Sequence, residues 1–204
     1  HGLMTGGRDG ARETLARFWT SVAASSPFAS SGDGGAGLSP ALKLMLQWTS
    51  HLSPEQLNPF DLNPLRDILG EQFDFVRLRR DAPIKLFIAA THANSGKLRL
   101  FRNHELSVDT LLASACLPTI HRSIVIDGEP YWDGGYSANP AVFPLAYQCT
   151  SPDILLILLT PLRYAETPAS AEDIRQRLLE LSFNATFLRE MRMFAHLREQ
   201  VGNR

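Results

Sequence analysis

Residues 112–118 read LASACLP, residues 124–128 read IVIDG and residues 131–140 read YWDGGYSANP. The first segment is rich in small residues and ends in a proline, so we predict a short helix that stops there. The second segment ends in Asp-Gly, a dipeptide that favours a tight turn, and it predicts a β-hairpin whose second strand leads into Asp-Gly-Gly. A helix, a hairpin and a glycine bend are therefore predicted in close succession within residues 112–140.

Asp133 is the residue in this stretch that we predict to carry chemistry. An aspartate has an ordinary pKa near 4 and is a weak base, so it must be partly desolvated and within hydrogen-bond reach of a hydroxyl to deprotonate it. Gly134 and Gly135 have no Cβ, which lets the backbone turn sharply and another segment approach closely. The alternative is an aspartate that only caps its own turn. A second Asp-Gly-Gly at Asp33 has no preceding strand and no following Asn-Pro, so we assign it to a solvent-exposed linker.

The stretch at 112–140 resembles the patatin-like phospholipase family. The C-terminal signature of that family is a small-residue helix ending in proline, a β-hairpin, and an Asp-Gly-Gly or Asp-Gly-Ala turn followed by Asn-Pro. The resemblance is close over about forty residues and continues more loosely through residues 86–91 upstream and through residue 154 downstream. It implies a Ser–Asp dyad without histidine, in which a serine in a Gly-x-Ser-x-Gly elbow attacks an ester carbonyl and Asp133 accepts the serine proton.

Two elements that the resemblance implies are not found in the sequence: the Gly-rich oxyanion loop and the serine elbow. The opening residues, up to Trp19, resemble the segment that comes after the nucleophile-bearing helix in this family, so we expect the serine to lie upstream of His1 and this chain alone to be inactive. Residues 37–41 read GLSPA, but Pro40 has no N–H where an elbow needs a donor to the oxyanion, and Ser39 is predicted to cap a helix. Ser114 is interpreted as a core hydroxyl bonded to a backbone carbonyl.

Alternating strand and helix patterns predict an α/β fold. We expect three α/β/α layers around a mostly parallel central sheet, with the N-terminal part of the fold missing. Strands are predicted at residues 84–91, 97–101 and 154–159, and the last of these is the most apolar run and is expected to be a central strand. Helices are predicted after cap residues and in the tail at 171–201, with a break near 183–184; the expected caps are Asp9 or Gly10, Ser39, Asn63, Ser107 and Asn139.

By this resemblance, residues 1–166 are expected to form the C-terminal portion of a patatin-like acyl hydrolase domain, and residues 167–204 a helical C-terminal extension that packs on it. A Ser/Gly-rich stretch at about 25–38 is expected to be a mobile surface loop. The tail resembles a bacterial subgroup of the same family that carries a helical extension. Its apolar residues recur at helical spacing, which favours core packing over a lid, and its polar side includes acidic residues, which does not suit an anionic membrane.

Composition excludes several classes of protein. The chain has 204 residues, 20 basic against 21 acidic side chains and a formal net charge of −1, which gives no electrostatic basis for a nucleic-acid partner. Neither of its two cysteines, Cys116 and Cys149, stands in a metal-ligand spacing, so we expect no metal and no cofactor. His92, His104 and His121 are interpreted as surface or turn residues and not as members of a triad.

The longest apolar run, at residues 154–159, is too short to cross a bilayer. We therefore expect no transmembrane segment and a soluble cytoplasmic protein, with contact to a membrane surface or a storage granule as a further option.

Three hypotheses for function follow from these observations. The first is a serine-dependent esterase or phospholipase that acts on a lipid or another acyl ester, with Asp133 as general base. The second is a non-catalytic fragment or scaffold that binds a lipid, a polyester granule or a partner protein, which the absent elbow motivates. The third keeps the chemistry of the first but takes a storage polyester as its substrate.

Overall fold

The computed structural model describes residues 1–25, 52–159 and 161–202, and it has an α/β fold built on one four-stranded sheet. The strands are β1 (Phe87–His92), β2 (Leu98–Arg102), β3 (Ile124–Ile126) and β4 (Glu129–Asp133). Their order across the sheet is β2-β1-β4-β3. β1 pairs with β2 and with β4, and β3 pairs with β4, so that Ala90 stands opposite Asp133.

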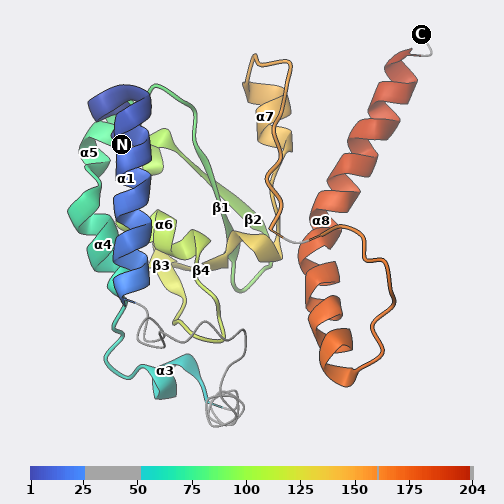
Figure 1. Cartoon of the computed structure of the whole chain (residues 1–204), viewed down its shortest axis with the longest axis horizontal. Coiled ribbons are helices and arrows are strands. Elements are labelled where there is room, and N and C mark those ends of the chain that lie inside the picture. The colour runs from blue at the N-terminus through green and yellow to red at the C-terminus, as the bar shows by residue number, and fades with distance from the viewer. Residues whose placement is uncertain (26–51, 160, 203–204) are drawn as a thin grey trace.

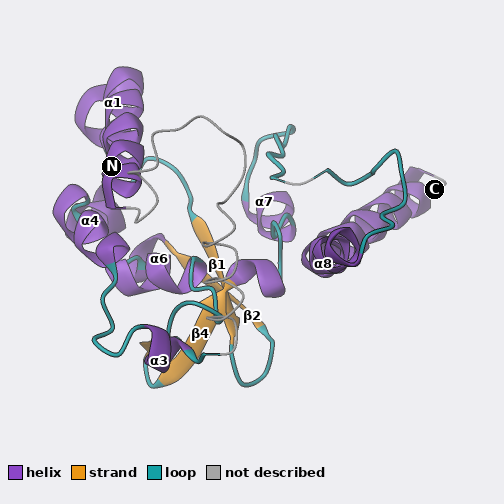
Figure 2. Ribbon diagram, turned by 60° about the horizontal axis from the view of Figure 1, so that its bottom comes forward, coloured by secondary structure: helices purple, strands orange, loops and turns teal. Residues whose placement is uncertain are grey.

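Helices lie on both sides of this sheet. Figures 1 and 2 show α1 and α4 on one side of it and α7 and α8 on the other. The helices are α1 (Gly2–Ser25), α3 (Pro54–Leu57), α4 (Pro64–Gln72), α5 (Phe75–Asp81), α6 (Val108–Ser114), α7 (Phe143–Gln148) and α8 (Ala171–Gly202), with 3-10 turns η1 (Asn103–Glu105) and η2 (Gly134–Tyr136).

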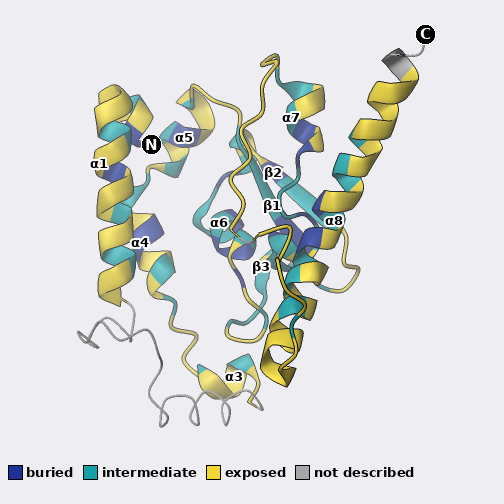
Figure 3. Cartoon of the chain, turned by 45° about the vertical axis from the view of Figure 1, so that its right-hand side comes forward, coloured by how far each residue is buried: buried dark blue, intermediate teal, exposed yellow. Residues whose placement is uncertain are grey.

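The core lies between the sheet and α6. Ala90, Phe101, Ala113 and Tyr131 form a buried cluster, against which isoleucines of β1 and β3 pack. Phe101 meets Tyr131 edge to face, with ring centroids 5.6 Å apart, a geometry that aromatic pairs prefer. Figure 3 shows this burial around α6 and the sheet, whereas α1 and most of α8 are exposed. Asp133, the last residue of β4, is thus close to the buried centre of the described fold.

Several local predictions are confirmed. The helix expected after Asn63 is α4, and the helix expected after Ser107 is α6, where Ser107 and Thr110 cap each other reciprocally. Both predicted hairpins form. The first turns through Gly96 at φ +67°, and the second through Asp127 and Gly128 at φ +53° and +84°, values that glycine and aspartate tolerate better than most residues.

The expected mostly parallel sheet is not present among the described residues, because all three strand pairs are antiparallel. Two of these pairs are hairpins, whose short connections allow only antiparallel pairing. The segment predicted as a central strand, residues 154–159, is described without strand structure, and every side chain in it is at least 36% exposed. A strand apolar on both faces needs neighbours on both faces, and the described residues place none there.

Helix ends also differ from the predictions. α1 begins at Gly2 and not after Asp9, and it kinks at Gly6 and Gly7, where Gly7 has φ +60°. Along this helix, Trp19 is 60% exposed, whereas Phe18 packs on Phe73.

Three further boundaries differ from the predictions. α7 begins at Phe143, several residues after Asn139, and β1 begins at Phe87, after the predicted start at residue 84. The expected break near 183–184 is absent, since α8 continues through both residues and Asn184 is 4% exposed. A buried polar residue within a helix therefore does not indicate a break here.

Three predictions fall on residues outside the described ranges: the loop at 25–38 beyond Ser25, the Asp33 linker, and the helix capped by Ser39.

Candidate active site

Asp133 is the last residue of β4, and its backbone is held on both sides. Its N–H donates to the carbonyl of Cys116, at 2.9 Å, which ties the end of the strand to the segment after α6. The Thr91 hydroxyl donates to the Asp133 carbonyl, at 2.8 Å. The Ser137 hydroxyl lies 2.8 Å from that of Thr91 and completes a short polar chain. Since Thr91 is only 4% exposed, its bonds are shielded from water, and they hold the backbone of Asp133 at the end of β4.

The carboxylate of Asp133 turns back over the glycine bend. Its Oδ1 accepts a hydrogen bond from the Gly135 N–H, at 2.7 Å. Burial raises the pKa of Asp133 above its ordinary value, although the bond from Gly135 acts in the opposite direction. No other hydrogen bond to this carboxylate is found among the described residues, so its second oxygen is free to accept a proton. A half-buried carboxylate with a raised pKa is a better general base than an ordinary aspartate.

Gly134 is required by the approach of β1. A Cβ at this position would lie 2.3 Å from the Ala89 carbonyl oxygen and 2.7 Å from the Ala89 Cβ. The first of these is a backbone atom of the central strand and cannot move aside without disturbing the pairing of β1 with β4. The glycine thus allows the bend after Asp133 to lie directly on the sheet.

Gly135 faces α8. A Cβ there would lie 2.8 Å from the edge of the Phe183 ring, and the neighbouring Tyr136 stacks against that ring with centroids 4.9 Å apart. Burial and the nearby Asp133 charge raise the pKa of Tyr136. The tail helix therefore contacts the bend at Asp133 directly.

The described residues near Asp133 do not include a nucleophile with the geometry of a dyad. The Cys116 thiol donates to the carbonyl of Arg122 at 3.1 Å, and burial, with the Asp133 charge, raises its pKa, so the thiolate is disfavoured. Ser137 is engaged with Thr91. Ser114 ends α6 half-buried, and the carbonyl bond expected for its hydroxyl is not found in the described part of the chain.

The three histidines lie in separate surroundings. His92 is bonded through Nε2 to Glu129, at 2.7 Å, and through Nδ1 to Ser95. His104 is largely exposed beside Glu105, and His121 lines a hollow of about 40 Å³ next to Cys116. Among the described residues, none of them has a hydrogen bond to Asp133.

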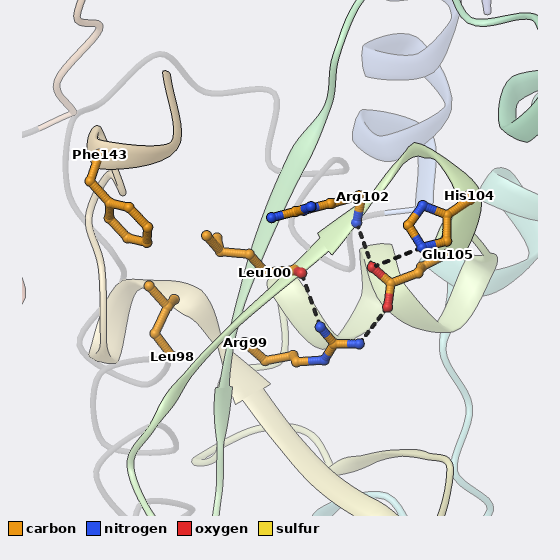
Figure 4. A pocket seen from close by; sticks show the side chains of 7 residues that line it. All are labelled: Leu98, Arg99, Leu100, Arg102, His104, Glu105 and Phe143. Atoms are coloured by element: carbon orange, nitrogen blue, oxygen red, sulfur yellow. Dashed lines mark hydrogen bonds and ion pairs between the residues drawn. The ribbon is translucent and has the colours of Figure 1, made fainter. Parts of the chain in front are cut away.

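A separate open hollow, of about 460 Å³, lies between β2 and Phe143. In Figure 4, Phe143 lies across it from Leu98 and Leu100, and the Arg102 side chain reaches into it. Arg99 turns away and bonds to Glu105 and to the Leu100 carbonyl.

Within residues 1–25, 52–159 and 161–202, no group of three or more His, Cys, Asp or Glu side chains is placed to hold a metal ion. None of the helices in the same ranges combines the length and the apolar character that a membrane crossing requires.

Sequence reasoning selected Asp133, Gly134 and Gly135, and the structure brings them together at the end of β4. It missed Thr91 and Phe183, which position the bend. A buried threonine in a strand has no distinctive sequence signal, and Phe183 is only one of several apolar residues at helical spacing in the tail.

Comparison with known proteins adds one match. The family model described as "Patatin-like phospholipase" matches residues 2–146, which include α1, the whole sheet and the bend at Asp133. The searches of curated proteins and of solved structures gave no match.

Proposed function

Because this chain belongs to the patatin-like phospholipase family, we propose that it is the aspartate-bearing part of a lipid acyl hydrolase. In this proposal a serine attacks the ester carbonyl while Asp133 accepts the serine proton and passes it to the departing alcohol, and water then hydrolyses the acyl-enzyme. The observation that carries the proposal is the carboxylate of Asp133: it is half-buried, is fixed through its backbone and has one oxygen unengaged among the described residues.

The bend after Asp133 supports a role beyond turn capping. A turn-capping aspartate needs only the bond from Gly135. Here the Asp133 carbonyl also receives the Thr91 hydroxyl, and Gly134 lies in van der Waals contact with β1. These extra constraints hold a general base within the narrow range of positions that proton transfer requires.

The nucleophile is proposed to be a serine in residues that precede His1 in the natural protein. Two observations support this. No described hydroxyl or thiol is bonded to the Asp133 carboxylate, and the apolar segment at 154–159 lacks described strand partners although its side chains suit a sheet interior. One upstream segment that supplies the serine and further strands would complete both the site and the mostly parallel sheet.

Labelling with a fluorophosphonate probe tests this assignment. The protein extended by its natural upstream sequence is expected to react at a single serine, mapped by mass spectrometry to a Gly-x-Ser-x-Gly segment, whereas the 204-residue chain remains unlabelled. Asp133→Asn in the extended protein should slow labelling because the serine loses its base. Labelling of a serine within residues 1–204 would move the nucleophile into this chain and refute the upstream location.

A second candidate function is a binding scaffold for a lipid, a polyester granule or a partner protein. The absence of a nucleophile bonded to Asp133 among the described residues favours it. It differs from the first proposal in its expected results. The extended protein would bind acyl esters without hydrolysing them, and the fluorophosphonate probe would label none of its serines.

The acid side of the pH profile gives an independent prediction. Burial raises the pKa of Asp133 above 3.8, and catalysis needs the ionised carboxylate. The acid limb of kcat/KM for a short-chain p-nitrophenyl ester, measured from about pH 3.5 to 8, is therefore expected at a higher pH than that of an ordinary aspartate. A limb at or below pH 3.8 would contradict the proposal.

The stability of the fold should respond to pH in the opposite sense. An acid with a raised pKa in the folded state binds its proton more tightly there than in the unfolded chain, so its stabilising contribution is complete below pH 3.8 and is lost as the pH rises through the raised value. As the pH rises through the raised pKa of Asp133, the rate of hydrolysis should therefore increase while the contribution of Asp133 to the stability of the fold is lost.

A further inference from the structure

α8 forms the floor of a groove that begins at Thr186, one helical turn beyond the Phe183 side chain that contacts the bend after Asp133, and we propose that this groove binds the alkyl chain of an acyl-ester substrate. The inference rests on the proposed function for its biological meaning, but its evidence is separate. α8 lies at residues 171–202, outside the part of the chain that the family model matches.

The groove is apolar and has the dimensions of a small ligand site. It has a volume of about 320 Å³ and lies between α7 and α8, with Phe143 and Tyr147 from α7 and Met193 and Phe194 from α8 in its walls. Pockets for small molecules begin at about 300 Å³ and are lined mainly by apolar and aromatic side chains. A single unbranched alkyl chain suits a narrow site of this composition.

A carboxylate from one wall of the groove is hydrogen-bonded to the backbone of the other wall. The Glu190 carboxylate of α8 accepts the backbone N–H of Phe143, the first residue of α7. α7 has no side-chain cap of its own at Val142, so Glu190 acts as its N-terminal cap from another helix. Burial raises the pKa of Glu190, whose side chain is partly buried where it meets α7.

One side of α8 connects the groove to the bend at Asp133. Phe183 contacts Gly135 and Tyr136, and Thr186, Glu190, Met193 and Phe194 follow it at the spacing of a single helical stripe. At about 1.5 Å of rise per residue, the stripe extends roughly 16 Å from Phe183 to Phe194. An ester with its carbonyl near Asp133 can therefore direct its alkyl chain along α8 into the groove.

Thr186 distinguishes an alkyl occupant from a polar one. Its hydroxyl oxygen is buried and has no hydrogen-bond partner among the described residues. An alkyl chain would leave this hydroxyl unpaired, so Thr186→Val should preserve or improve binding. A ligand with a polar group could bond to this buried oxygen only by displacing its neighbours, and such a ligand would lose affinity in the same variant.

Methyl NMR of the 204-residue chain tests the proposal without any requirement for catalysis. The chain has four methionines, and Met193 lies in the groove wall. Titration with 1-decanol, a neutral probe that cannot pair with Arg189, is expected to shift the Met193 methyl signal saturably and to leave that of Met4 in place. If three of the six additional methylenes become buried, 1-decanol should bind about 60-fold more tightly than 1-butanol.

A matched pair of substitutions locates the site. Thr186→Phe fills the groove and should weaken 1-decanol binding at least tenfold, whereas Leu188→Phe, at a residue of α8 that is 43% exposed and outside the groove wall, should not. If Thr186→Phe does not fold, Tyr147→Asp serves instead, because this wall residue is 71% exposed and its charge opposes an alkyl chain.

Three results would overturn the groove assignment: a Met193 signal that does not move with 1-decanol, equal weakening by Thr186→Phe and Leu188→Phe, or weakening by Thr186→Val. Failure of the proposed function is recognised separately, since it would leave 1-decanol binding intact and remove only turnover. In a catalytically active protein, Thr186→Phe should also reduce kcat/KM for decanoate esters relative to butanoate esters.

Discussion

Asp133→Asn is expected to lower the rate of ester hydrolysis by about 10²- to 10⁴-fold in the protein that carries the serine, because an amide cannot accept the serine proton. The fold should remain. The Asn side-chain oxygen can still accept the bond from Gly135, and the backbone bonds with Cys116 and Thr91 do not involve the side chain. The substitution also removes a carboxylate that burial disfavours, so the Tm at pH 7 should be unchanged or higher.

Asp127→Asn is the matched control for this experiment. Asp127 lies six positions earlier in the same hairpin, is exposed, and adopts φ +53°, which asparagine tolerates as well as aspartate. Its hydrolysis rate should match that of the unmodified protein. Initial rates with a p-nitrophenyl ester and melting curves for both variants decide the matter: a rate for Asp133→Asn within about threefold of the control rules out the general-base role.

Gly134→Ala is expected to have the largest effect on stability of any single-methyl addition at the bend. The new Cβ would lie 2.3 Å from the Ala89 carbonyl oxygen, so the pairing of β1 with β4 must shift to admit it. Forced overpacking of this kind costs about 1–3 kcal/mol or more, which for a chain of this length lowers the Tm by roughly 3–10 °C. Hydrolysis should fall as well, because Asp133 moves with the strand end.

Two other glycines provide the comparison for this prediction. Gly135→Ala meets the edge of the Phe183 side chain and not backbone, so a small rotation can relieve the contact and the loss should be smaller. Gly70→Ala, within α4 and with open space around it, should stabilise the chain by about 0.5–1 kcal/mol. Thermal unfolding of the three variants should rank Gly134→Ala lowest and Gly70→Ala highest; a Tm for Gly134→Ala equal to that for Gly135→Ala would contradict the contact with Ala89.

The family model covers α1, the sheet and the bend, and it supports the hydrolysis of lipid esters. It ends before α8, the tail helix, whose contacts with the bend come from the structure alone. The division of the chain into residues 1–166 and 167–204 remains a prediction, although the contacts of Phe183 and Glu190 show that α8 packs against the bend and α7.

Features encoded within a few residues could be predicted from the sequence. The helix starts after Asn63 and Ser107, the turn at Asp127-Gly128 and the glycine bend after Asp133 each depend on local backbone preferences or on hydrogen bonds between near neighbours. The pattern in which these elements follow one another was sufficient to identify the family and to select Asp133.

Composition alone predicts a strand at residues 154–159, and the structure describes these residues without strand pairing. Six consecutive apolar residues are typical of a central strand, but composition cannot supply the neighbouring strands that complete its hydrogen bonds. The parallel sheet was not observed for the same reason, since a parallel pair depends on segments far apart in the chain.

By itself, therefore, the sequence determined which short elements form and which carboxylate follows the second hairpin, because their interactions act over a few residues. Only the tertiary structure decided how that carboxylate is held and what surrounds it. Thr91 reaches the Asp133 carbonyl across 42 positions of sequence, and Glu190 caps Phe143 across 47. Such contacts form only when packing brings distant segments together, so the local preferences of the two residues cannot predict them.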